Sequence, residues 1–124
     1  MTKINTSSSE ELVGMVVESI QEKKGKNITS LNISALDNSF CDYFVICEAS
    51  STTQVEAIAN FVEFNLKEKL QEYPLHVEGK RNAQWVLVDY GNVVVHIFLD
   101  AVRDFYKLES LWGDGKVAHI PNLD

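Results

Sequence analysis

The segment WVLVDYGNVVVHIF, from Trp85 to Phe98, predicts a β-hairpin. Two runs rich in β-branched and aromatic residues flank the dipeptide Gly91-Asn92, and such runs are typical of strands. A two-residue type II′ turn needs a positive φ at its first central position, which glycine supplies. We therefore expect antiparallel strands over Trp85–Asp89 and Val93–Leu99.

The turn also predicts the register, and the register assigns each side chain to one face of the sheet. Trp85 should pair with Phe98 and Leu87 with His96, and successive side chains point to opposite faces. One face then collects β-branched residues with a tyrosine at its edge: Val86, Val88, Val93, Val95, Ile97 and Tyr90. We expect helices to cover this face, which would place it in the core.

The opposite face of the hairpin mixes aromatic, aliphatic and polar side chains: Trp85, Leu87, Asp89, Val94, His96 and Phe98. Left open, it would be an apolar patch with polar members, which often marks a protein-binding site. Alternatively, it packs beneath another element with Asp89 near solvent. Asp89 lies diagonal to His96 and is placed to pair with it. The residue types leave both interpretations open, and a register slip of one residue would exchange the two faces.

Two amphipathic helices are predicted before the hairpin. The first begins with a capping box at Ser8–Glu11, and Gly25 is placed to end it in a left-handed conformation. The second runs from about Thr52 to Leu70 after a capping box at Ser51–Gln54, and Pro74 prevents its continuation. Both carry apolar residues at the i, i+4 spacing of one helix face.

Three further strands are expected upstream of the hairpin. Asn27 to Ser34 alternates between polar and apolar residues, with an irregularity near Ser30. Tyr43 to Cys47 is a continuous apolar run, which is typical of a central strand buried on both faces. Leu75 to Glu78 is long enough for a short strand.

After the hairpin, a short helix is expected over Asp104 to Leu111, and the chain after Gly113 is polar and expected to be mobile. The predicted organisation is a disordered segment over residues 1–7, one folded domain over residues 8–114 and a C-terminal tail over residues 115–124. The element order predicts a single-domain α/β (α+β) fold, with a mixed sheet of about five strands and helices packed largely on one face.

Composition limits the classes of function. The chain has 124 residues, 18 acidic against 11 basic, for a net charge of -7. It therefore lacks the cationic footprint of a protein that binds bare nucleic acid, and it favours a basic protein partner. No apolar run approaches the roughly 20 residues of a membrane span, and Met1 to Ser9 lacks the apolar region of a secretory signal. A cytoplasmic location is expected.

Neither cysteines nor histidines form a recognisable catalytic or metal-binding pattern. Cys41 and Cys47 match no redox or zinc spacing, and His76, His96 and His119 are not at i, i+4 spacing. A Cys47–His96 dyad requires neighbouring strands, but Cys47 lies in an apolar run where the thiolate is disfavoured. We expect no catalytic residue, no metal and no cofactor.

One enzymatic alternative remains, because Ser50-Ser51 at a helix start can hold a phosphate. Nucleotidyltransferases combine such a start with a pair of carboxylates that hold magnesium. The following strands contain no Asp-x-Asp or Glu-x-Glu, and Asp89 is a single carboxylate. Ser51 is more simply interpreted as a helix N-cap.

Arg103 and Tyr106 fall on one face of the short helix at i, i+3. One interpretation puts both beside the mixed face of the hairpin. The other buries Phe105, Leu108 and Trp112 in the core and leaves Arg103 in solvent.

Several segments together resemble the ribosome silencing factor family, also called Iojap or YbeB-like proteins. They are DYFVIC (residues 42–47) with Ala49–Ser51, QVEAIAN (54–60), Glu78-Gly79, AQWVLVDYGNVVVHIF (83–98) and RDFYKLESLW (103–112). The match runs in order from about Leu12 to Asp114. The resemblance implies a nucleotidyltransferase-like topology that lacks the carboxylate pair.

The resemblance also implies a function. Members bind the large ribosomal subunit through its protein L-fourteen, block joining of the small subunit and so lower translation when nutrients are scarce; they are commonly homodimers when free. An enzyme of the nucleotidyltransferase type and a large-subunit assembly factor are the alternatives. Carried over by motif, the partner-binding residues are Trp85, Leu87, Asp89, Tyr90, His96, Arg103 and Tyr106.

Overall fold

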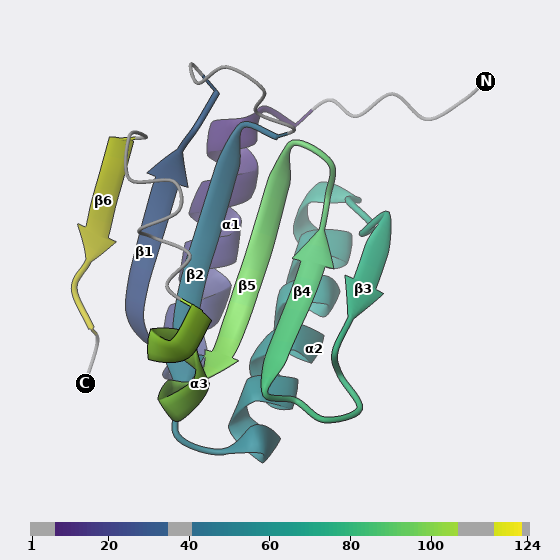
Figure 1. Cartoon of the computed structure of the whole chain (residues 1–124). Coiled ribbons are helices and arrows are strands. Elements are labelled where there is room, and N and C mark those ends of the chain that lie inside the picture. The colour runs from purple at the N-terminus through teal and green to yellow at the C-terminus, as the bar shows by residue number, and fades with distance from the viewer. Residues whose placement is uncertain (1–6, 35–40, 107–115, 123–124) are drawn as a thin grey trace.

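The computed structural model describes residues 7–34, 41–106 and 116–122. Within them, three helices accompany one mixed sheet of six strands in the order β3-β4-β5-β2-β1-β6 (Figure 1). The elements are α1 (Ser9–Glu22), β1 (Lys26–Asn32), β2 (Tyr43–Ala49), α2 (Thr52–Leu70), β3 (His76–Glu78), β4 (Trp85–Asp89), β5 (Val93–Leu99), α3 (Asp100–Tyr106) and β6 (Lys116–Ile120). The β2–β5 pair is parallel and the other four pairs are antiparallel.

The start of α1 is confirmed, but its end differs from the prediction. Ser8 forms the capping box, since its Oγ accepts from the Glu11 amide at 3.1 Å and its own amide donates to the Glu11 carboxylate at 3.0 Å. The left-handed residue is Lys24, with φ +64°, and not Gly25. Gly25 is needed for space, because a Cβ there would lie 2.3 Å from Cγ2 of Ile20.

The bounds predicted for α2 are confirmed, and Ser51 is its N-cap, accepting from the Gln54 amide at 3.1 Å. The predicted reciprocal bond of the capping box gives way to a different use of Gln54. Its Nε2 donates to the carbonyl oxygens of Lys23 and Lys24 at 3.2 Å each. Because the last carbonyls of a helix need external donors, Gln54 joins the start of α2 to the end of α1.

The β-hairpin is confirmed in its strands, turn and register. Trp85 pairs with Phe98 and Leu87 with His96. Gly91 has φ +90°, as the turn requires. The central position of β2 between β1 and β5 is also confirmed. The irregularity of β1 lies between Lys26 and Thr29, rather than near Ser30.

Two expectations for the C-terminal part are wrong. The helix α3 begins at Asp100, four residues before the predicted start. The segment Lys116–Ile120 is not a mobile tail: it forms β6, which pairs antiparallel with β1 and raises the number of strands to six. The expectations for residues 1–6 and 107–115 lie outside the described residues.

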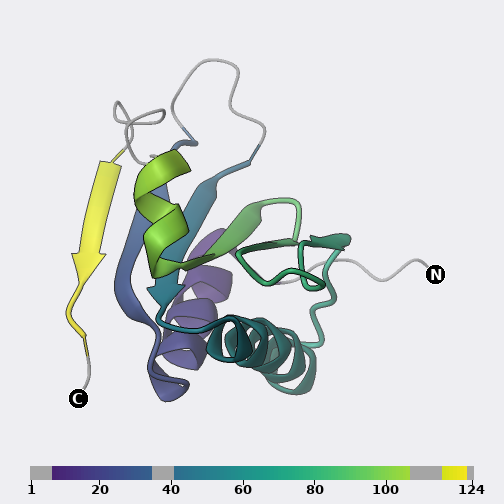
Figure 2. The same ribbon diagram turned by 60° about the horizontal axis from the view of Figure 1, so that its bottom comes forward.

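The sheet has two unequal faces. Helices α1 and α2 cover one face, and the third described helix, α3, lies on the other (Figures 1 and 2). The helix-side core, between the sheet and α1 and α2, contains the β-branched face of the hairpin, as predicted: Val86, Val88, Val93, Val95 and Ile97 are completely buried there. The prediction that helices pack largely on one face is thus confirmed.

Candidate functional site

The face of the sheet that carries α3 holds a second apolar cluster, which we call the α3-side cluster. It consists of Leu31, Ile33, Cys41, Phe44, Ile46, Val94 and Phe98, with Trp85, Leu87 and Val102 packed against it. On the hairpin, the β5 side chains of this face are buried, whereas Trp85, Leu87 and Asp89 of β4 are half-buried. Each of the two interpretations of this face therefore holds for one strand: β5 is covered and β4 is partly open.

Trp85 is held in place by aromatic contacts and by a hydrogen bond to His96. Its ring stacks on Phe98 with centroids 5.1 Å apart, and its Nε1 donates to Nδ1 of His96 at 3.1 Å. Phe44 meets the His96 ring edge-on at 4.8 Å. Such offset and edge-on pairs are favourable beyond the area they bury. These contacts therefore fix the orientation of the indole, which lies half-buried at the edge of the α3-side cluster.

His96 is a buried, neutral side chain. Burial lowers its pKa from 6.5 to about 4. Because Nδ1 accepts from Trp85, the neutral ring carries its proton on Nε2, and this nitrogen has no hydrogen-bond partner among the described residues. The expected Asp89–His96 pair is wrong, since Oδ1 of Asp89 instead accepts from the Gly91 amide at 2.7 Å and stabilises the turn.

Acid should destabilise the fold through His96. The unfolded chain binds this proton near pH 6.5 and the folded protein only near pH 4, so the unfolded state takes up more protons as the pH falls. Linkage then removes about 2 kcal/mol from the free energy of unfolding between about pH 6.5 and about pH 4.5. The measurement is urea unfolding of wild type and His96→Gln across that range. Glutamine still accepts from Trp85 and does not titrate, so identical pH dependence in both proteins would refute the assignment.

Tyr90 lies on the other side of the sheet from Trp85. Only 5% of it is exposed, in the helix-side core. Burial raises the pKa of its hydroxyl, and the nearby carboxylates of Glu63 and Glu72 add to this effect. Direct contact between Tyr90 and a partner that docks on Trp85 would therefore require the sheet or its helices to move.

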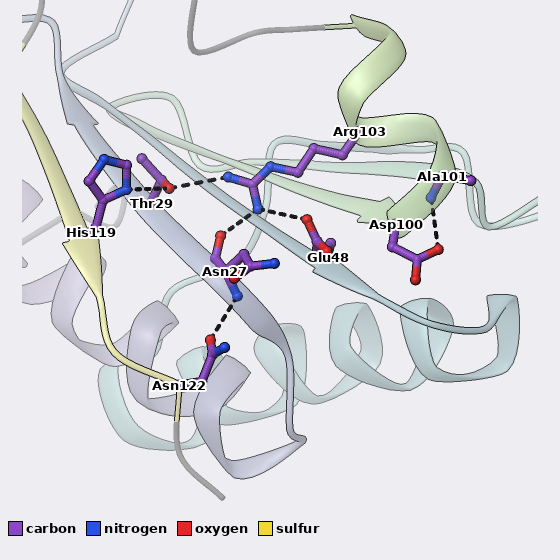
Figure 3. Close-up of polar contacts among 8 residues, drawn as sticks. All are labelled: Asn27, Thr29, Glu48, Asp100, Ala101, Arg103, His119 and Asn122. Carbon is purple, nitrogen blue, oxygen red and sulfur yellow. Dashed lines mark hydrogen bonds and ion pairs between the residues drawn. The ribbon is translucent and has the colours of Figure 1, made fainter.

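Arg103 follows neither of its two predicted placements. It is buried, and it points away from the hairpin toward β1 and β2 (Figure 3). Its guanidinium donates to the carbonyl oxygen of Asn27, to Oγ1 of Thr29 at 3.1 Å and to Oε1 of Glu48 at 3.3 Å. The sequence pattern does not single out Asn27 and Thr29, because most residues of this strand, KNITSLN, are polar. The side chain of Tyr106 lies outside the described residues.

Cys47 and His96 do not form the disfavoured catalytic dyad, although β2 and β5 are neighbours. Cys47 lies in the helix-side core, and His96 contacts Phe44 and Phe98 of the α3-side cluster. Burial raises the pKa of the Cys47 thiol to about 12, which disfavours the nucleophilic thiolate. Among the described residues, no three His, Cys, Asp or Glu side chains group as a metal site, and no helix is long and apolar enough to span a membrane.

The start of α2 borders a cleft of about 280 Å³, lined by Lys24, Lys26, Glu48, Ala49, Ser50, Gln54 and Asp100. The two carboxylates that line this cleft, Glu48 and Asp100, already accept hydrogen bonds from the protein. Glu48 accepts from Arg103, and Asp100 accepts from the Ala101 amide at 2.7 Å. Ser51 acts as the N-cap of α2, as its simpler interpretation predicts.

Comparisons with known proteins match nearly the whole chain to one family. A family model described as "Ribosomal silencing factor during starvation" matches residues 6–124. Two proteins called ribosomal silencing factor are similar to this chain: one from Halalkalibacterium halodurans, 37% identical over 94% of this chain and 97% of its own length, and one from Chromobacterium violaceum, 40% identical over 86% of each.

More distant and structural relatives extend the comparison. A mouse protein named "Mitochondrial assembly of ribosomal large subunit protein 1" is 29% identical over 81% of this chain, which covers 44% of the mouse protein. A crystal structure of a Chromobacterium violaceum protein superposes with a TM-score of 0.82 at 37% identity, covering 94% of this chain and 95% of that one.

Proposed function

The chain belongs to the ribosomal silencing factor family, and we propose that it binds the large ribosomal subunit through ribosomal protein L-fourteen and blocks joining of the small subunit. Family membership supports an association with the large subunit, and the name of the mouse relative points to the same subunit. The proposed result is repression of translation under nutrient limitation, by a non-enzymatic, cytoplasmic protein that is a homodimer when free.

The observation that carries the proposal is the partly open part of the α3-side face on β4. Trp85 and Leu87 are half-buried there beside an apolar cluster, and Asp89 lies on the same face. Tryptophan is over-represented among the residues that dominate binding energies. We propose Trp85, Leu87 and Asp89 as contact residues, with His96 orienting Trp85 from beneath.

The mechanism is steric. A domain of 14.0 kDa bound at the joining surface occupies the volume that the small subunit needs. The net charge of -7 suits a basic ribosomal protein but is repelled by the surrounding phosphates. Contacts should therefore be local and anchored by aromatic burial, and a standard interface of about 800 Å² per partner is within reach of one sheet face.

The test uses purified large and small subunits and sedimentation through a sucrose gradient. The protein should sediment with large subunits alone, should not sediment with small subunits, and in excess should lower the yield of joined ribosomes. Free ribosomal protein L-fourteen should compete for the protein. Undiminished joining by a saturating concentration of the protein would overturn the proposal.

A role in large-subunit assembly is the second candidate, because a relative carries that name. The same gradients separate the two roles. Binding to large-subunit precursors with no binding to mature subunits would favour assembly. If the protein were instead a nucleotidyltransferase, titrating it with nucleotide and magnesium in a calorimeter should give a heat of binding.

A further inference from the structure

Arg103 is the polar centre of the packing between α3 and the sheet. Only 8% of the residue is exposed, and among the described residues it donates to β1 and β2, at the Asn27 carbonyl, the Thr29 hydroxyl and the Glu48 carboxylate (Figure 3). A buried guanidinium needs both neutralisation and acceptors. Glu48 supplies the opposite charge, and all three residues supply acceptor atoms.

The two β1 residues that accept from Arg103 also bond to the C-terminal segment, Thr29 to His119 in β6 and Asn27 to Asn122 just after it. We call Asn27 and Thr29 the β1 anchor. Oγ1 of Thr29 lies 3.3 Å from Nδ1 of His119 in β6, and the amide of Asn27 donates to Oδ1 of Asn122 at 2.8 Å. Thr29 can accept from Arg103 and donate its own proton to His119 at once. The β1 anchor therefore bonds both to α3 and to the C-terminal segment, in addition to the backbone pairing of β6 with β1 from Ile28 to Asn32.

A break in the β1–β2 ladder frees the backbone of Asn27 to bond with Arg103. The register shifts between Lys26 and Thr29, and Asn27 there has φ +51°, a left-handed conformation that asparagine tolerates better than most residues. Such bulges re-aim backbone groups within a sheet. Here the Asn27 carbonyl is directed to a side chain of α3.

The position of α3 affects the candidate binding surface. Val102, the neighbour of Arg103, packs against the α3-side cluster, and Trp85 and Leu87 pack against the same cluster. A displacement of α3 would therefore change the packing beneath the Trp85 side chain. Arg103 itself faces β1 and is buried, so it is not placed to contact a partner on β4.

We infer that Arg103 is a positioning residue, which holds α3 against the sheet and, through the β1 anchor, couples α3 to β6. The part of this inference that concerns partner binding rests on the proposed function. The coupling between the two elements does not.

Two substitutions test the inference. Thr29→Val removes one hydroxyl at a position that is 2% exposed, and Arg103→Lys keeps the charge but loses the planar fork. Hydrogen exchange should become about tenfold faster in both α3 and β6 in either variant, because one charge-assisted hydrogen bond is lost. Affinity for purified large subunits should fall by about fivefold in both.

Two matched controls separate positioning from other effects. Arg81→Lys changes an exposed arginine and should match wild type in all measurements. Val16→Ala destabilises the helix-side core and should keep wild-type affinity at temperatures where the variant is folded. An equal loss of affinity in Val16→Ala would mean that lowered stability, and not the position of α3, weakens binding.

Three other results would separate the coupling of α3 to β6, the positioning role of Arg103 and the proposed function. Faster exchange in α3 with unchanged exchange in β6 would overturn the coupling. Wild-type affinity of Thr29→Val and Arg103→Lys, despite faster exchange, would overturn the positioning role. If wild type itself fails to bind large subunits, the proposed function fails, while the exchange measurements still test the β1 anchor.

Discussion

Replacement of Trp85 by alanine should weaken binding to the large ribosomal subunit by about 100-fold, on the scale of a binding hot spot. The indole is half-buried in the free protein, stacked on Phe98 at 5.1 Å and bonded to His96. It reaches the complex already oriented, so little conformational entropy is lost on binding. The affinity is measured by sedimentation with purified subunits, at a temperature where unfolding curves show the variant to be folded.

Two further variants sharpen the Trp85 experiment. Tyr73 is an aromatic residue that is 58% exposed and is not part of the α3-side cluster, so Tyr73→Ala should bind as wild type does. Trp85→Phe keeps a stacking ring but loses the Nε1 donor, and its affinity should be intermediate. Wild-type binding by a folded Trp85→Ala variant would remove the β4 part of the α3-side face from the proposed interface.

Replacement of Gly79 by alanine should lower the free energy of unfolding by on the order of 4 kcal/mol. Gly79 has φ +90°, and a Cβ there would lie 2.1 Å from the backbone carbonyl oxygen of Trp85. Backbone atoms cannot rotate away as a flexible side chain can, so the loop or β4 must shift. The measurement is urea unfolding, with the midpoint and slope compared with those of wild type.

Gly14→Ala is the matched control for Gly79→Ala. Gly14 lies inside α1, and a Cβ there would meet nothing within 4 Å. Alanine should raise the free energy of unfolding by roughly 0.5–1 kcal/mol, because glycine is a poor helix former. Equal effects of the two substitutions would show that the close approach of Gly79 to Trp85 is absent in solution.

Local signals in the sequence were sufficient for much of the fold. The hairpin register follows from Gly91-Asn92, because a two-residue turn leaves one pairing that keeps the β-branched side chains on one face. The bounds of α2 follow from the Ser51 cap and the apolar stripe that ends before Pro74. In both cases the residues that set the boundary lie within the element or next to it.

Features that depend on distant contacts were missed. The strand β6 has exposed side chains from Val117 to His119 and pairs on one side with β1, so no alternating pattern marks it. The direction of Arg103 depends on how α3 is rotated over the sheet, which an i, i+3 spacing does not specify. The pairing of Asp89 with His96 was wrong because the carboxylate of Asp89 accepts instead from the backbone amide of Gly91 in the adjacent turn.

The order of strands has a consequence for synthesis of the protein. Of the described strands, β1 is the first in the chain, yet its outer neighbour β6 is the last. Until Lys116–Ile120 leaves the ribosome, the hydrogen-bonding groups along that side of β1 have no strand to pair with, and exposed edges of this kind recruit other chains. A nascent or prematurely terminated chain that ends before Lys116 should therefore aggregate more readily than the full chain, because β6 shields the edge of the sheet.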